Sequence, residues 1–218
     1  QFVLESQYPV GGWPQRYPLM YDHPFKGNKD YSSFITLNDD VIPEATEFLM
    51  QCYQALGIPG LKEPVLRAMY LIITLQQGEP YAGWADQYFV DDLKPAHGRS
   101  YEPRSVNTGT TVAMIRLLMN YYRLTGDTRF LSGIPNAIDF LESVKIPAED
   151  AVKWRRQPRN ADEFLVPRFV HPETGKPQYV HRKGSNVVNG TYYIDQNIEN
   201  TIAHYSSVYT VNPSALRR

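Results

Sequence analysis

Apolar residues recur at intervals of three and four in several stretches of the chain, which is the spacing of one face of a helix. In the first stretch they run from Val41 to Leu56, where Gly57 offers a helix end. The spacing predicts helices over about 42–56, 64–78, 108–124 and 135–144. Residues 1–40 show only a helical turn at 2–6 and predict an ordered loop.

A different pattern follows residue 150. Short stretches at 178–181 and 192–194 predict β-strands between polar loops, and one more helix is expected at 197–205. The whole pattern predicts a mostly α-helical protein with long loops and short β pieces.

The helical part of the sequence repeats. Residues 49–57 resemble residues 118–126, which lie 69 positions later, and the loop at 12–17 resembles the loop at 83–88, which lies 71 positions later. A helix-turn-helix unit cannot bury its apolar face alone. We therefore expect α-hairpins packed as an α/α toroid, with equivalent helix starts along one rim.

Charge and cysteine content exclude several classes of protein. Lys and Arg total 22 against 23 Asp and Glu, so no overall basic field favours nucleic acid. The most apolar run, residues 68–75, is too short for a membrane span of roughly 20 residues. Cys52 is the single cysteine, which excludes an intrachain disulfide and a cysteine-based zinc site. A charged ligand must therefore meet a local cluster.

Asn38, Asp39 and Asp40 precede the first predicted helix. Asn and Asp side chains often cap the free N–H groups of a helix start, and capping alone would account for them. Adjacent carboxylates are also suited to a hard cation such as calcium. The sequence leaves both interpretations open.

Two further polar groups are candidates for a site. Arg99 and Glu102 lie in a loop between the helical units, where they could form a surface ion pair or serve a ligand. Arg168, Arg182 and Lys183 lie in the last third of the chain. A basic set of this kind is usually a solvated face, but arginine also grips carboxylates with two hydrogen bonds.

Aromatic side chains surround these loops. They could stack on a ligand or pack against helix ends, and the four best placed are Trp13, Tyr17, Trp84 and Tyr88. No glycine pattern of a serine-hydrolase elbow and no glycine-rich phosphate loop is present. The five histidines lack the spacing of a helical metal site.

Four segments form motifs in a fixed order. They are QYPVGGWPQRYPL at 7–19, ITLND at 35–39, LKPAHGRSYE at 93–102, and Arg168-Phe169 followed by Thr174, Pro177 and Arg182. These segments resemble the QYPxGGWPQ, ITxND, LxPxxARxYE and RFYxxxTxxPxFxxRDG motifs of the family-10 pectate lyases. The resemblance extends over most of the chain.

The resemblance implies an (α/α)3 toroid, secreted or periplasmic, that cleaves polygalacturonate by calcium-dependent β-elimination. By position, it assigns Asp39, with Asp40, to calcium and Arg99 to the catalytic base. The remaining residues that it implies as substrate contacts are Arg168, Arg182, Lys183, Trp13, Tyr101 and Glu102.

The implied chemistry agrees with the residues. Removal of the C5 proton of a uronate builds negative charge toward its carboxylate, so the site must hold a cation or arginines. An arginine is protonated under ordinary conditions. It can act as a base only where neighbouring cations disfavour its charge, and an alkaline pH optimum would follow.

The chain also departs from the family. Gln87-Tyr88-Phe89 stands where the family has QHD, Lys183 replaces an aspartate, and 107–111 lacks an acidic residue. Family members carry a further α-hairpin before the first motif, so we expect one domain over 1–218 that lacks this hairpin. Three functions remain open: an active lyase, a non-catalytic protein that binds pectin or uronate, and a structural α-toroid.

Overall fold

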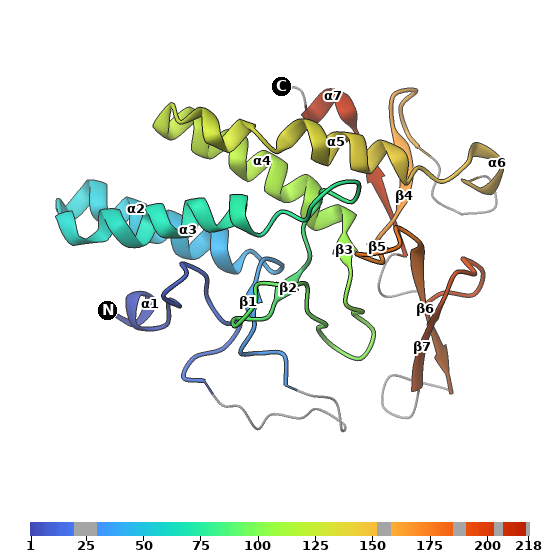
Figure 1. Ribbon diagram of the computed structural model, residues 1–218, viewed down its shortest axis with the longest axis horizontal. Coiled ribbons are helices and arrows are strands. Elements are labelled where there is room, and N and C mark those ends of the chain that lie inside the picture. The colour runs from blue at the N-terminus through green and yellow to red at the C-terminus, as the bar shows by residue number, and fades with distance from the viewer. Residues whose placement is uncertain (20–29, 152–157, 185–190, 203–206, 217–218) are drawn as a thin grey trace.

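The computed structural model describes residues 1–19, 30–151, 158–184, 191–202 and 207–216. Figure 1 shows the long helices stacked in one part of the molecule, the connecting loops along one side of them, and most strands at one end. No helix among the described residues is long and apolar enough to cross a membrane.

Two helical hairpins form the helical part. Each consists of a long helix, a short 3-10 helix and a second long helix. The elements are α2 (Val41–Leu56), η1 (Pro59–Leu61) and α3 (Lys62–Thr74), then α4 (Thr108–Thr125), η2 (Thr128–Leu131) and α5 (Ile134–Ser143). A single helical turn, α1 (Phe2–Glu5), precedes them. These elements confirm the four helices and the first turn expected from the apolar spacing, although α3 ends at Thr74 rather than near residue 78.

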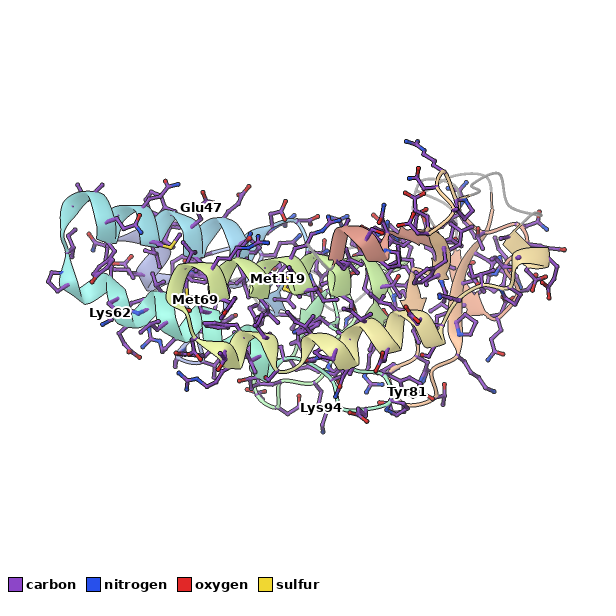
Figure 2. All side chains as sticks on the ribbon, turned by 90° about the horizontal axis from the view of Figure 1, so that it is seen from above. Glu47, Lys62, Met69, Tyr81, Lys94 and Met119 are labelled. Carbon is purple, nitrogen blue, oxygen red and sulfur yellow. The ribbon has the colours of Figure 1, made fainter. Side chains whose placement is uncertain are left out.

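The core lies between the helices. Ile42, Ile72 and Ile115 are fully buried and come from α2, α3 and α4. Figure 2 shows Met69 and Met119 within the helical layer, and Glu47 and Lys62 at its outside. Apolar side chains at helical spacing therefore face one another, which is why the periodicity located the helices correctly.

The sequence repeat is also a repeat of hydrogen bonds. The indole N–H of Trp13 donates to Val3 O at 2.8 Å, and the indole N–H of Trp84 donates to Ile72 O at 2.7 Å. Gln7 Nε2 donates to the carbonyls of Gly11 and Pro64, and Gln76 Nε2 donates to those of Ala82 and Gly133. Each loop thus turns back on the end of the preceding helix in the same way.

Short antiparallel strands complete the fold. The strand β1 (Ile35–Thr36) pairs with β2 (Gln87–Tyr88). A four-stranded sheet has the order β3 (Val106–Asn107), β5 (Phe169–Val170), β6 (Pro177–Lys183) and β7 (Thr191–Asp195). The remaining elements are β4 (Phe164–Pro167), paired with β8 (Val208–Val211), and the single turns α6 (Ala148–Ala151) and α7 (Pro213–Leu216).

The expectation of a mostly α-helical (α/α)3 toroid is wrong. The structure is mixed, with several antiparallel sheets beside the two helical hairpins. Val166, Val170 and Val211 come from strands and join the main core. Between residues 158 and 216, the described part of the chain forms strands and one helical turn, so apolar strand residues complete the core there.

The strands at 178–181 and 192–194 are confirmed within β6 and β7. The helix expected at 197–205 is wrong for residues 197–202, which form a turn between stretches without regular secondary structure. Residues 203–205 lie outside the described residues.

Gly126→Ala should lower the free energy of unfolding by about 1 kcal/mol, because Gly126 ends α4 with φ 72° and an L-residue is strained in that conformation. Urea denaturation measures the change. Gly60→Ala is the matched control, since a Cβ at either glycine meets no atom within 4 Å but Gly60 has no positive φ. An equal loss in both variants would contradict a backbone cause.

Candidate functional site

The loops that follow β1 and surround β2 bring the two repeats together. The carbonyl of Asp86 accepts hydrogen bonds from Leu37 N at 2.8 Å and Asn38 N at 3.3 Å. The start of α2 is thereby fixed beside the Trp84 loop. This places Asp39 at the junction of the repeats.

Asp39 and Asp40 adopt an unusual backbone conformation. Both have positive φ, 53° and 55°, in the left-handed region that non-glycine residues seldom occupy. Asp40 is the residue before α2, and its side chain makes no capping hydrogen bond to the described backbone. Strain of this kind is often found at functional sites.

The equivalent start of α4 is capped normally. Asn107 Oδ1 accepts from Gly109 N at 2.8 Å and Thr110 N at 3.2 Å. The capping interpretation therefore holds at Asn107, but it does not describe the Asp40 side chain. The carboxylates before α2 remain available for another role.

Asp39 faces the loop that carries Arg99. Its Oδ2 lies 3.9 Å from Arg99 Nη2 and accepts a hydrogen bond from Gln15 Nε2 at 3.1 Å. The side chains of Asp39 and Arg99 are 53% and 35% exposed, so an ion pair between them contributes little stability. The structure thus brings together two candidates that are 60 positions apart in the sequence.

Arg99 is held from two other sides. Its Nε donates to the Tyr31 hydroxyl at 3.2 Å, and its backbone N–H donates to Glu102 Oε2 at 2.7 Å. Glu102 itself is only 5% exposed. Its carboxylate therefore belongs to the interior of the Arg99 loop, and little of it is open to a substrate.

Asp86 is a carboxylate of the site that the sequence motifs did not single out. Burial raises its pKa, while hydrogen bonds from Thr110 Oγ1 and from Asn107 Nδ2, the latter at 2.8 Å, act in the opposite direction. Glu102 and Arg168 are close enough to act on it electrostatically. The signal that could have found it was the loop repeat, in which Asp86 is the counterpart of Gln15.

The basic candidates lie on the sheet beside this junction. Arg168 separates β4 from β5, and its carbonyl accepts from Thr108 N at 2.9 Å, which places it at the start of α4. Arg182 pairs in register with Tyr192, whose ring lies 5.3 Å from the ring of Tyr101 in the Arg99 loop. Directly opposed residues of an antiparallel pair share one face of the sheet. Arg182 therefore shares the face of β6 and β7 that contacts this loop.

Lys183 is on the other face of the same strand. Its ammonium lies 5.3 Å from the ring of Tyr193, which pairs in register with His181. Arg182 and Lys183 are adjacent and so point to opposite faces. They do not both face the Arg99 loop.

The aromatic candidates separate by exposure. Trp13, Trp84 and Tyr88 are 3%, 0% and 0% exposed, so the packing interpretation describes them, and Trp13 offers no open ring face to a sugar. Tyr17 is 37% exposed and contacts Phe2 edge to face at 5.6 Å.

The described residues contain no group of three or more His, Cys, Asp or Glu side chains placed to hold a metal ion. Oxygen acceptors do gather near Asp39, however. Gln15 Oε1 and Asn38 Oδ1 are buried and have no hydrogen-bond partner within the described part of the chain. Amide and carboxylate oxygens are suitable ligands for a hard cation, but these atoms alone do not complete its coordination shell.

The chain matches a known protein family. The family described as pectic acid lyase matches residues 1–189, so the chain belongs to this family. A comparison with curated proteins finds no match.

Two solved structures share the fold. A family 10 polysaccharide lyase from Cellvibrio cellulosa is 20% identical, with a TM-score of 0.62 over 81% of this chain and 57% of that chain. An aspartate-to-alanine mutant of a family 10 lyase from the same organism, in complex with trigalacturonic acid, is 20% identical, with a TM-score of 0.63 over 81% of this chain and 58% of that chain. The chain thus spans less than two thirds of the length of these structures.

Asp86→Asn should flatten the pH dependence of stability. Because burial raises the pKa of Asp86 in the fold, the stability it contributes is complete below the ordinary value of 3.8 and is lost as pH rises through the raised value. Urea unfolding over an acid-to-neutral pH series should show a smaller fall in the variant. The control is Asp139→Asn at an exposed position of α5, and an unchanged slope in the Asp86 variant would contradict the assignment.

Proposed function

We propose that this protein is a polysaccharide lyase that cleaves polygalacturonate or oligogalacturonides by β-elimination. The observation that carries the proposal is the approach of Asp39 to Arg99 at 3.9 Å in a chain of the pectic acid lyase family. Packing alone requires neither of these partly exposed side chains. The trigalacturonic acid complex of a structural relative supports a uronate as the ligand.

Arg99 is the base in this proposal. It takes the C5 proton of a galacturonate unit, the C4–O bond breaks, and a double bond forms between C4 and C5. The leaving oxygen gains a proton from water, and Arg99 returns the C5 proton to solvent. In the free protein Asp39 and Glu102 lie 3.9 and 3.8 Å from the guanidinium and stabilise its charge. The base therefore becomes effective in alkaline solution.

Arg168 and Arg182 bind uronate carboxylates in this proposal. Arg182 shares a sheet face with Tyr192, which contacts the Arg99 loop through Tyr101. Arg168 lies at the start of α4, within electrostatic range of Asp86. Arg168 is thus close to Asp86, and Arg182 lies on the sheet face that contacts the Arg99 loop.

Calcium is the proposed cofactor, with Asp39 as its carboxylate ligand. The accessible Asp39 carboxylate and the neighbouring amide oxygens fit a hard cation that completes its coordination with water and substrate oxygens. When bound, the ion would neutralise the uronate carboxylate. Both aspartates are exposed, but the Asp39 carboxylate lies 3.9 Å from Arg99 and contacts Gln15, so Asp39 is the stronger candidate of the two.

A non-catalytic protein that binds uronates is the second candidate. It is favoured by the absence of a three-ligand metal cluster among the described residues. An exported location, secreted or periplasmic, suits either function because pectate lies outside cells.

Arg99→Ala should lower the rate of polygalacturonate cleavage by about 100-fold or more, since it removes the proposed base. Absorbance of the unsaturated product in alkaline buffer with calcium measures the rate, and calorimetry with trigalacturonate measures binding. Arg116→Ala, at an exposed position of α4, is the control. Binding by the wild type without any cleavage would favour the second candidate.

Asp39→Asn should raise the calcium concentration needed for half-maximal cleavage, because an amide replaces a charged ligand while the left-handed backbone is still tolerated. Asp40→Asn has the same backbone constraint and should leave the calcium dependence nearly unchanged. Equal effects in the two variants would overturn the choice of Asp39.

A further inference from the structure

Glu102 is a buried carboxylate in the same loop as Arg99. Only 5% of the residue is exposed. A buried carboxylate is costly unless its charge is paired and hydrogen-bonded. The groups around the Glu102 carboxylate should therefore indicate the function of its charge.

Both oxygens of Glu102 face Arg99. Oε2 accepts the backbone N–H of Arg99 at 2.7 Å, and Oε1 lies 3.8 Å from Arg99 Nη1. That second distance is within ion-pair range but too long for a hydrogen bond. Oε1 has no hydrogen-bond partner elsewhere in the part of the chain that the structure describes.

The backbone closes the same loop. Glu102 N donates to Arg99 O at 2.8 Å, and Gly98 N donates to Glu102 O at 3.0 Å. A Cβ added at Gly98 would lie 2.5 Å from Glu102 Oε2. The glycine therefore leaves room for the carboxylate to reach the Arg99 N–H.

We propose that Glu102 is a positioning residue, which holds the Arg99 loop through Oε2 and orients the guanidinium through the charge of Oε1. The proposal rests on the proposed function, in which Arg99 is the base. Asp39 and the Tyr31 hydroxyl hold the guanidinium from other sides, at 3.9 and 3.2 Å. Glu102 from the same loop and two residues from the distant segment 31–39 thus hold one side chain.

The two oxygens of Glu102 have different roles, so its effect on the guanidinium can be tested separately from its effect on loop stability. A glutamine can still accept the Arg99 N–H with its carbonyl oxygen, so Glu102→Gln preserves the hydrogen bond of the loop. It replaces the charge that faces the guanidinium with an amide. A purely structural Glu102 would tolerate this change.

The experiment compares Glu102→Gln with the wild type and with Glu142→Gln, an exposed glutamate of α5 that pairs with Lys145 at 3.8 Å. Cleavage kinetics give kcat and KM over a pH series, and thermal unfolding reports folding. Glu102→Gln should lower kcat about tenfold to 100-fold with little change in KM or unfolding temperature.

An unchanged kcat in Glu102→Gln would overturn the proposal. A rise in KM with kcat unchanged would do so as well, because it would indicate direct substrate binding. If Glu102→Gln fails to fold, Glu102→Asp provides the comparison, since it keeps the charge on a shorter side chain and should retain part of kcat.

A second measurement does not depend on lyase activity. Phenylglyoxal modifies arginines, and mass spectrometry can follow Arg99 and the exposed Arg116 separately. Glu102→Gln should speed modification of Arg99 severalfold and leave Arg116 unchanged. A wild type without cleavage would refute the proposed function alone, whereas equal Arg99 modification in both proteins would refute the role of Glu102.

Discussion

The candidate site depends on the hydrogen bonds of one residue, Asp86. Its carbonyl holds Leu37 N and Asn38 N before α2, while its carboxylate holds Asn107 and Thr110 at the start of α4. One half-buried residue therefore fixes the starts of α2 and α4. Burying this carboxylate costs free energy, and the same burial raises the pKa of Asp86. The cost falls at the point where the two repeats meet.

The two repeats use one architecture for different purposes. At α4 the asparagine side chain closes the helix end. At α2 the corresponding Asn38 has an oxygen without a partner in the described chain, and Asp39 turns toward Arg99. Duplication of a hairpin thus supplies a stable frame, in which one helix start serves packing while the other carries exposed charge. The near neutrality of the chain is an average over such local differences.

The helices could be predicted from the sequence because long apolar stripes have a clear period. Strands such as β1 and β2 are two residues long and have none, so pairing across distant segments decides them. The toroid prediction failed for the same reason, since strand residues such as Val170 complete the core. In the site, the motifs identified Asp39 and Arg99, but burial distinguishes Trp13 from an exposed aromatic, and strand alternation separates Arg182 from Lys183.

The left-handed backbone before α2 restricts which residues can replace Asp39 and Asp40. Glycine, asparagine and aspartate enter this region most easily, whereas residues with larger side chains do so at a cost. Glutamate would keep the charge and lose the backbone preference, and asparagine would do the reverse. Aspartate meets both demands, because the same side chain carries a negative charge and tolerates the left-handed backbone.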